Sequence, residues 1–302
     1  MKKEEGENMK QAIGIVGLGR VGIPAAQAYL DSGYNVYGYA RRREVIERFQ
    51  AMGGKHLNSP KQVAEAASML IVLVLNDAQT MDVVASQTGL LAGSQPGHTI
   101  INMSTINRDN LEWVAQQCAA RKVKFVDCPF TGGPARVPTG SLTLIAAAPL
   151  ELIEEARPIL EVIGNIVHVG EEPGLGQAVK HCNQLLVGST HAAVMEVITM
   201  ARRLGLDVKQ VCRVIGSGIA GSDYFRLLSE SVLEHKPSPG GLGQMCKDMS
   251  IVVNTGRSIK VPLYVATAAY YYFLGAQALD MENMEGADLI RVVDRISNPA
   301  SA

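Results

Sequence analysis

Residues 176–201 form a long apolar run that contains a cluster of polar side chains. Lys180, Asn183 and Gln184 stand at positions i, i+3 and i+4 of this run, and in a helix this spacing places all three on one face. Lysine is seldom buried without a partner. Partial burial disfavours the ammonium form, so such a lysine can exchange a proton near neutral pH. The spacing indicates a proton-transfer group beside two amides; the alternative is a lysine that reaches water from the helix edge.

A glycine-rich turn follows the apolar stretch AIGIV and begins a helical stretch. Its residues are Gly17, Leu18, Gly19, Arg20, Val21 and Gly22. Glycines in this G-x-G-x-x-G pattern allow a tight turn and a close approach of the backbone to a pyrophosphate at the helix N-terminus. The placement between strand and helix predicts a dinucleotide-binding site. The alternative is a glycine turn that only packs a helix on a strand.

The next expected strand, NVYGYA, is followed by Arg41, Arg42 and Arg43. NAD-binding proteins usually carry an acidic residue here, which binds the ribose 2′-hydroxyl. A planar guanidinium instead suits a 2′-phosphate. The arginines therefore favour NADP(H), with NAD(H) as the alternative cofactor, and Arg41 is the first candidate ahead of Arg42. They would otherwise be the solvated start of a surface helix.

The elements that must position these residues fall into two parts. From residue 11, short runs rich in Val, Ile and Leu alternate with helical stretches, which is typical of a parallel sheet buried on both faces. After Gly170 helical periodicity dominates. We predict an α/β protein with a Rossmann-type doubly wound sheet domain and an all-α domain, joined by a long interdomain helix. The predicted parts are a flexible tail at 1–10, the sheet domain at 11–173 and the helical domain at 174–302.

Composition narrows the class of protein. The net charge of −1, from 28 Lys+Arg and 29 Asp+Glu, shows no basic surplus for nucleic acid or an anionic membrane. The first residues, MKKEEGENMK, lack the apolar core of a signal peptide, and no apolar stretch suits a membrane span. The five cysteines form no CxxC pair and the histidines show no common ligand spacing, so no metal site is expected. These features predict a soluble, cytoplasmic protein.

Four further stretches, taken with residues 17–22, resemble the β-hydroxyacid dehydrogenases, a family that includes 3-hydroxyisobutyrate dehydrogenase. They are MST at 103–105, DCPFTGG at 127–133, GLGQAVKHCNQ at 174–184 and KD at 247–248. The motifs follow the family's order and spacing from about residue 11 to 290. The resemblance implies an NAD(P)-dependent oxidoreductase that acts on a small carboxylate substrate, either a hydroxy acid or its semialdehyde or keto form.

The resemblance also implies a role for individual residues. Lys180 matches the catalytic lysine, which would give its proton to the carbonyl oxygen during reduction and take one back during oxidation. Contacts to substrate are implied for Thr131, Gly132, Gly133, Asn183 and Gln184. Contacts to the cofactor are implied for Val74, Leu75, Thr105 and Lys247.

Two departures from the family pattern bear on the substrate. The family usually has two consecutive asparagines where this chain has Asn183 and Gln184. The glutamine at the second position is similar to the threonate dehydrogenase branch. Arg136 stands where many members have glycine. It is predicted either to bind an acidic group of the substrate or to be an exposed loop residue. Threonate dehydrogenases look NAD-linked, so Arg41 is a further difference from that branch.

Two other classes of protein share parts of the pattern. Imine reductases are similar in both domains and favour NADPH, and the second class is a non-catalytic dinucleotide-binding domain used as an oligomerisation or reader scaffold. Both generally lack the catalytic lysine, so Lys180 favours the dehydrogenase. The last helices, including residues 270–273 (YYYF), carry too much apolar surface for an isolated bundle, and we expect a homodimer or homotetramer.

Overall fold

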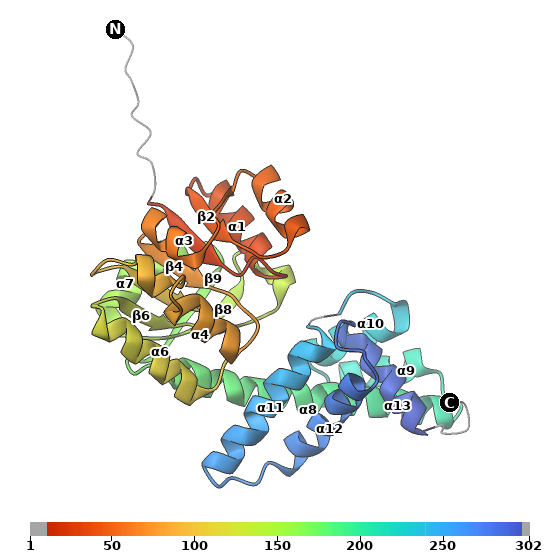
Figure 1. Cartoon of the computed structure of the whole chain (residues 1–302). Coiled ribbons are helices and arrows are strands. Elements are labelled where there is room, and N and C mark those ends of the chain that lie inside the picture. Colours follow the sequence, from red (N-terminus) through yellow and green to blue (C-terminus); the bar gives the residue numbers. More distant parts are fainter. Residues whose placement is uncertain (1–10, 239, 298–302) are drawn as a thin grey trace. The chain divides into compact units, whose positions relative to one another are not determined.

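The computed structural model describes residues 11–238 and 240–297, so the predicted tail at 1–10 lies outside the described residues. The chain divides into two compact units, the first ending at Lys180 and the second beginning at His181 (Figure 1). This division falls within the long helix α8 (Leu175–Arg203). The predicted fold class is confirmed: a Rossmann-like sheet unit precedes a long helix and an all-helical unit.

The first unit contains a nine-stranded sheet with the order β3-β2-β1-β4-β5-β6-β8-β7, and β9 pairs with β8. The strands are β1 (Ile13–Val16), β2 (Val36–Tyr39), β3 (Lys55–His56), β4 (Met69–Val72), β5 (Thr99–Asn102), β6 (Lys124–Asp127), β7 (Phe130–Thr131), β8 (Leu142–Ala147) and β9 (Gly164–Gly170). Pairing is parallel from β3 through β6, whereas β8 runs antiparallel to β6 and β7. The expected parallel sheet is confirmed for these first strands and wrong at β8.

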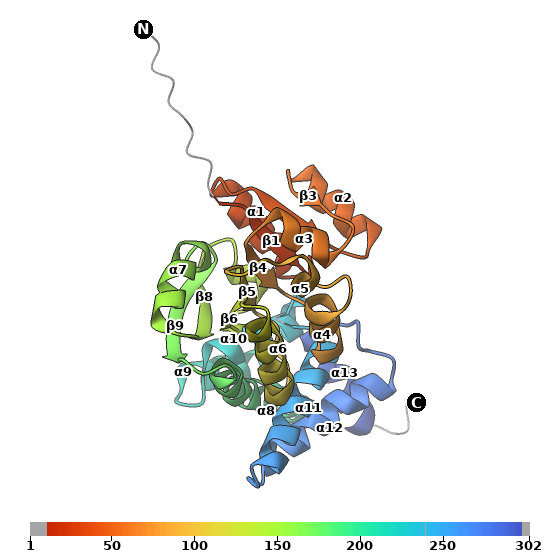
Figure 2. The same ribbon diagram turned by 60° about the vertical axis from the view of Figure 1, so that its left-hand side comes forward.

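The reversal at β8 has a local cause. A parallel pair requires a crossover connection, usually a helix. Between β6 and β8 the chain instead forms the short strand β7 and a 3-10 helix, η1 (Pro134–Arg136). A helix, α7 (Leu150–Leu160), then links β8 to β9, which are parallel, and it packs on β9 (Figure 2).

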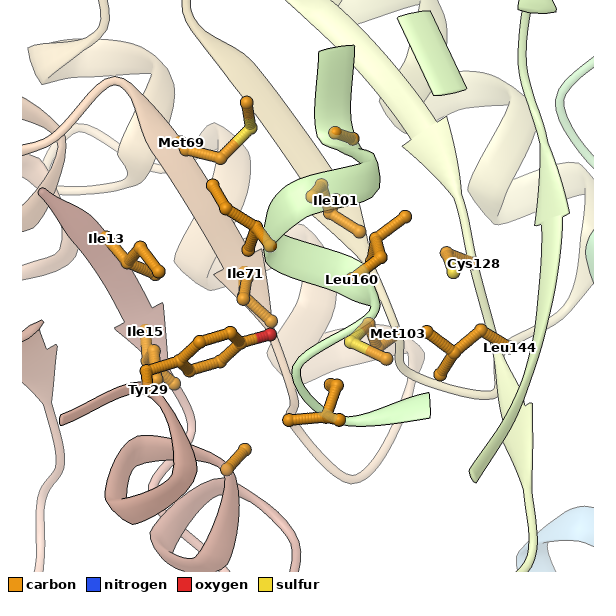
Figure 3. Close-up of a cluster of buried hydrophobic side chains, with 14 of the residues drawn as sticks. Ile13, Ile15, Tyr29, Met69, Ile71, Ile101, Met103, Cys128, Leu144 and Leu160 are labelled. Atoms are coloured by element: carbon orange, nitrogen blue, oxygen red, sulfur yellow. The ribbon is translucent and has the colours of Figure 1, made fainter. Parts of the chain in front are cut away.

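Helices cover both faces of the sheet, because alternate side chains of a strand point to opposite faces. In β4, Met69 and Ile71 enter a core that includes Tyr29 of α1 and Leu160 of α7 (Figure 3). Leu70 and Val72 enter a second core, formed with α3 to α6. The remaining helices are α1 (Gly22–Asp31), α2 (Arg43–Ala51), α3 (Pro60–Ala66), α4 (Asp77–Ala85), α5 (Leu90–Gly93) and α6 (Arg108–Ala120).

Five neighbouring strands end in register. Val16 pairs with both Tyr39 and Val72, Val72 with Asn102, and Asn102 with Asp127. Each is the last residue of its strand. The loops that follow β1, β2, β4, β5 and β6 therefore leave from one edge of the sheet. The carboxyl edge of an open α/β sheet is where such folds bind ligands.

The second unit is helical in its described residues. It contains α8 from His181 onward and α9 (Val208–Ser217), α10 (Asp223–Glu234), α11 (Leu242–Ser258), α12 (Tyr264–Ala278) and α13 (Leu289–Ser297). Its core includes Met195, Ile198, Met249 and Phe273, each 0% exposed. Helices α11 and α12 lie side by side (Figures 1 and 2). Across the part of the chain that the structure describes, none of the helices combines the length and apolar character needed to span a membrane.

A histidine is buried in this helical core. His191 is 0% exposed, its Nε2 lies 2.9 Å from the Gly286 carbonyl oxygen, and its Nδ1 lies 2.9 Å from the Tyr224 hydroxyl. A neutral imidazole satisfies both partners, donating to the carbonyl and accepting from the hydroxyl. Burial lowers the pKa of His191 to about 4, against the opposing effect of the bond to Gly286.

Candidate functional site

The glycine-rich turn after β1 combines two tight positions with an open one. Gly17 has a φ of +105°, and a Cβ there would lie 2.3 Å from the Leu73 carbonyl oxygen. A Cβ on Gly22 would lie 2.0 Å from the Gly17 carbonyl oxygen, whereas one on Gly19 would meet no atom within 4 Å. The turn therefore depends on glycine at two positions. At the third it leaves room for a group to approach the backbone.

Helix α1 begins directly at this turn. Its N-cap, Val21, makes no side-chain hydrogen bond, and its first turn contains no acidic residue. Leu18 packs into the core and is 3% exposed, whereas the Arg20 side chain is exposed. Uncapped N–H groups at a helix N-terminus attract an anion. The turn and α1 together fit the pyrophosphate of a dinucleotide.

The arginines after β2 differ in their partners. Arg42 pairs with Glu44 at 3.5 Å, and Arg43 pairs with Glu47 at 2.8 Å. Arg41 is exposed and has no ion pair with any residue that the structure describes. Surface pairs of this kind are weak, but they direct two of the three guanidinium groups toward α2. Arg41 is then the arginine best suited to a 2′-phosphate.

The loops after β4 and β5 are joined by a hydrogen bond. The Val74 N–H donates to the Ser104 hydroxyl at 3.0 Å, and Thr105 follows Ser104 directly. The next residue along the first loop, Leu75, is apolar and 50% exposed. An exposed leucine held on a fixed loop offers an apolar surface for a flat ring.

The loop after β7 places Arg136 against the glycines that the resemblance assigns to substrate. Gly132 and Gly133 have φ angles of +121° and +75°, which favour glycine. A Cβ on Gly132 would lie 2.8 Å from Cδ of Arg136, so the arginine stem packs on this loop. Thr131, in β7, pairs with Thr143 of β8. The structure therefore brings together Thr131, the two glycines and Arg136.

A buried carboxylate caps the start of α8. Asp127, the last residue of β6, is 0% exposed. It accepts hydrogen bonds from the Gly174 N–H at 3.0 Å, the Gln177 N–H at 3.1 Å and the Gln177 Nε2 at 2.9 Å. Burial raises the pKa of Asp127 to about 6, and these hydrogen bonds oppose that rise. A Cβ on Gly176 would lie 2.8 Å from Asp127 Oδ2, so the carboxylate fits because this position is glycine.

Gln177 extends this cap to the loop after β5. Its Oε1 accepts from the Ile106 N–H at 3.0 Å, and its Nε2 donates to the Ser104 carbonyl oxygen at 3.1 Å. Lys180, 8% exposed, stands three residues farther along α8. The helical turn that carries Lys180 is thus fixed to the carboxyl edge of the sheet, beside the loop that follows β5. Sequence reasoning assigned no role to Asp127 or Gln177.

A second polar group lies in the helical unit. Asn183 Nδ2 donates to Gln184 Oε1 at 2.9 Å, and Gln184 Nε2 donates to Asp248 Oδ2 at 2.7 Å. Lys247 Nζ lies 2.6 Å from Asp248 Oδ1. Asp248 is 1% exposed. The structure brings together Asn183, Gln184 and Lys247 through a carboxylate whose role was missed, although an acid within the apolar stretch MCKDMSIVV was the available signal.

In the ranges 11–238 and 240–297, no group of three or more His, Cys, Asp or Glu side chains is arranged to hold a metal ion. The candidate groups of the first unit are backbone N–H groups, arginine side chains and Lys180. Those of the second unit are the amides of Asn183 and Gln184 and the Lys247 ammonium.

Comparison with known proteins finds similarity along nearly the whole chain. Residues 12–170 match the model for the NAD binding domain of 6-phosphogluconate dehydrogenase, and residues 174–293 match the model for the NAD-binding domain of NADP-dependent 3-hydroxyisobutyrate dehydrogenase. The chain is 30% identical to an L-threonate dehydrogenase of Cupriavidus necator, over 97% of this chain and 100% of that one.

Two solved structures are similar in fold and sequence. The crystal structure of a 3-hydroxyisobutyrate dehydrogenase from Salmonella typhimurium is 25% identical, with a TM-score of 0.86, over 94% of this chain and 100% of that chain. The structure of Psf3 in complex with NADP+ and 2-OPP is 26% identical, with a TM-score of 0.85, over 93% of this chain and 100% of that chain.

Proposed function

The chain belongs to the 3-hydroxyisobutyrate dehydrogenase family of NAD(P)-dependent hydroxyacid oxidoreductases, and we propose that it is an NADP-preferring member with Lys180 as general acid and base. Its substrate is a small hydroxy acid or the corresponding semialdehyde or keto acid. The observation that carries this proposal is the anchoring of the Lys180 turn by Asp127 and Gln177. That anchor holds the lysine's backbone at the edge of the sheet where the dinucleotide loops leave.

The residues at this edge fit the parts of a dinucleotide. The turn at 17–22 and the N-terminus of α1 would hold the pyrophosphate, and Arg41 would bind the 2′-phosphate with help from Arg42. The apolar face formed by Val74 and Leu75, with Thr105, would support the nicotinamide. Lys247 is assigned to the cofactor by the family resemblance. When bound, the nicotinamide supplies or accepts the hydride.

Lys180 moves the proton of the reacting oxygen. In reduction its ammonium donates a proton to the carbonyl oxygen as that oxygen gains negative charge; in oxidation the neutral amine removes the hydroxyl proton. Lys180 is 8% exposed. Asn183 and Gln184, one turn later, supply amides that hydrogen-bond the substrate.

The loop at 131–133 holds the substrate carboxylate. The Gly132 and Gly133 N–H groups and the Thr131 hydroxyl can all donate to its oxygens. Arg136, packed against Gly132, would pair with this carboxylate or with a second acidic group on the substrate.

Turnover of hydroxy acids with NADP+ tests the proton-transfer role. Purified protein is incubated with threonate, glycerate and 3-hydroxyisobutyrate, and the reduced nicotinamide is followed by absorbance. Lys180→Ala should lower kcat by about 100-fold to 10,000-fold, the range expected for removal of a general acid or base. The control is Lys209→Ala, an exposed lysine of α9, which should behave as wild type. Undiminished activity of Lys180→Ala would contradict the mechanism.

The cofactor preference is tested by a pair of arginine variants. Arg41→Ala should raise the KM for NADPH by about tenfold or more, because it removes a charge-assisted contact to phosphate, and should leave the KM for NADH nearly unchanged. Arg43→Ala, which loses only its pair with Glu47, is the matched control. Equal effects of Arg41→Ala on the two cofactors would refute the assignment.

We also propose that the chain forms a homodimer or homotetramer. The support is the exposed apolar surface of α12, where Tyr264, Val265 and Tyr271 are 81%, 70% and 63% exposed. Size-exclusion chromatography with light scattering tests this. A mass equal to the 32.3 kDa of one chain would contradict it.

A further inference from the structure

A cavity within the helical unit is lined mainly by arginine. Its volume is about 480 Å³, which is within the range of small-molecule sites. Arg202 and Arg203, at the end of α8, line it together with Arg291 and Arg295 of α13. Among the lining residues that the structure describes, Asp294 is the one acid. The cavity therefore has an excess of positive charge.

Hydrogen bonds between α8 and α13 hold the frame of this cavity. Asp294 Oδ2 accepts from Arg202 Nη1 at 3.0 Å, and Asp294 Oδ1 accepts from the Thr199 hydroxyl at 3.2 Å. Arg203 Nη2 donates to the Ser297 carbonyl oxygen at 2.9 Å. These bonds join α13 to the last turns of α8 (Figure 1). The acid is thus already engaged in fixing the two helices.

The two arginines of α13 are less constrained. Arg295 makes no ion pair or hydrogen bond with residues 11–238 and 240–297. Arg291 Nη1 lies 3.8 Å from Asp288 Oδ1 and 3.5 Å from Met284 Sδ, and a surface ion pair of this length contributes little. Each guanidinium carries five N–H donors in a planar fork. Arg291 and Arg295 therefore keep most of their donors for a further acceptor.

Helix electrostatics account for only part of this arrangement. Arg202, Arg203 and Arg295 stand in the last turns of their helices, where the negative end of the helix dipole favours cations. Arg291 is the third residue of α13, where the positive end disfavours a cation. Arg291 and Arg295 are also i and i+4, a spacing at which like charges repel. A gathering of positive charge that the helix itself disfavours points to an anionic ligand.

We propose that this cavity binds a small polyanion, a molecule with two or more phosphate or carboxylate groups. Arg291 and Arg295 bind one anionic group through paired N–H donors, the geometry in which a guanidinium meets phosphate or carboxylate. The two arginines at the end of α8 attract a second anionic group. Leu279 and Met281 form an apolar part of the lining, which suits a short carbon body between the two groups. The site lies within one unit and does not depend on the proposed dehydrogenase activity.

Calorimetric titration of the whole protein, without nicotinamide cofactor or hydroxy acid, tests the proposal. The ligands titrated are pyrophosphate and citrate, with acetate as the singly charged comparison. At least one polyanion should bind, and the tighter of the two identifies phosphate or carboxylate as the preferred group. Acetate should bind at least about tenfold more weakly, because it engages only one pair of arginines. No binding of either polyanion would overturn the proposal.

Substitutions at single arginines assign the binding to the cavity. Arg295→Gln removes a guanidinium without breaking a contact in the described part of the chain, so the fold is kept. The affinity should fall by about tenfold to a hundredfold, the effect of losing a charge-assisted contact. Arg291→Gln should act similarly. Arg213→Gln is the matched control: it removes the same charge from an exposed position of α9, outside the cavity. Equal affinities of Arg295→Gln and Arg213→Gln would overturn the proposal.

Hydrogen exchange locates the bound anion, since the glycine-rich turn of the first unit offers pyrophosphate a second place to bind. Occupation of the cavity should slow exchange at residues 199–203 and 291–295, because the ligand ties the two helices together. Slowed exchange confined to residues 17–22 would overturn the proposal, as would binding of single-stranded DNA but of neither small polyanion. A protein that binds citrate in the cavity and oxidises no hydroxy acid would refute the proposed function alone.

Discussion

Two buried aspartates, one in each unit, accept the side-chain amide of a glutamine on the same helix. Asp127 binds Gln177, and Asp248 binds Gln184. Asp127 is otherwise surrounded by backbone N–H donors, whereas Asp248 has the Lys247 ammonium beside it. The first carboxylate caps a helix; the second sets the direction of a chain of amides. An aspartate and a glutamine thus fix the position of the start of α8 in the first unit. In the second unit the same two residue types determine which amide groups donate and which accept.

The largest expected difference is between Gln177→Leu and Gln184→Leu. Gln177 is 0% exposed, and its loss would leave the Ile106 N–H, the Ser104 carbonyl and Asp127 each short of a buried partner. We expect a loss of about 4 kcal/mol in the free energy of unfolding for Gln177→Leu and about 2 kcal/mol for Gln184→Leu.

Urea unfolding measures this difference. The single tryptophan, Trp113, lies in α6 of the first unit, so its fluorescence follows that unit, while hydrogen exchange in α11 follows the second. Equal losses in the free energy of unfolding would mean that Gln177 and Gln184 contribute similarly to stability, which would contradict this expectation.

The two units should also respond to acid in opposite directions. Asp127 has its pKa raised from 3.8 to about 6, so the folded first unit binds the proton more tightly than the unfolded chain. Its contribution to stability is fully present below pH 3.8 and is lost as the pH rises through 6. His191 has its pKa lowered from 6.5 to about 4. Its contribution is present above pH 6.5 and is lost as the pH falls toward 4.

Between pH 7 and 4 each group should change the free energy of unfolding of its own unit by about 3 kcal/mol. On acidification the Asp127 contribution raises the free energy of unfolding of the first unit, and Asp127→Asn should remove this rise. The His191 contribution lowers the free energy of unfolding of the second unit, and His191→Gln should remove this fall. Unfolding at a series of pH values, with Trp113 fluorescence and hydrogen exchange as the two probes, measures both slopes. For each unit, the slope of the variant is subtracted from that of the wild type, which leaves the contribution of Asp127 or His191 to the pH dependence of the free energy of unfolding. Two contributions of the same sign would refute the assignment.

A smaller contrast is expected between two helical glycines of α8. A Cβ on Gly176 would lie 2.9 Å from the Ile145 carbonyl oxygen, part of the rigid sheet. One on Gly188 would lie 2.1 Å from Met249 Sδ, but methionine adjusts its rotamers readily. We expect Gly176→Ala to lower the free energy of unfolding by about 2 kcal/mol. Gly188→Ala should cost less than about 1 kcal/mol, because alanine also favours the helix. Thermal unfolding of the two variants side by side measures the contrast.

Local pattern was enough to predict most of the fold. The strand and helix periods indicated the two parts, and the turn at 17–22 was recognisable because strand, glycines and helix are adjacent in sequence. The antiparallel direction of β8 was missed, since an apolar strand has the same pattern in either direction. The partners of Asp127 and Asp248 were also missed, because they stand 50 and 64 residues away. Gln184 was selected from its spacing, but the direction of its amide depends on that distant carboxylate.

The aligned strand ends also bear on how such enzymes diverge. Val16, Tyr39, Val72, Asn102 and Asp127 share one register, and the proposed function gives the loop after each of them a separate task. One loop can change in length or sequence while the sheet stays the same, so cofactor choice and substrate choice can be altered independently by mutation or by design. An insertion of one residue inside a strand is different. It would exchange the side chains of the two cores, and selection should therefore confine insertions to the loops.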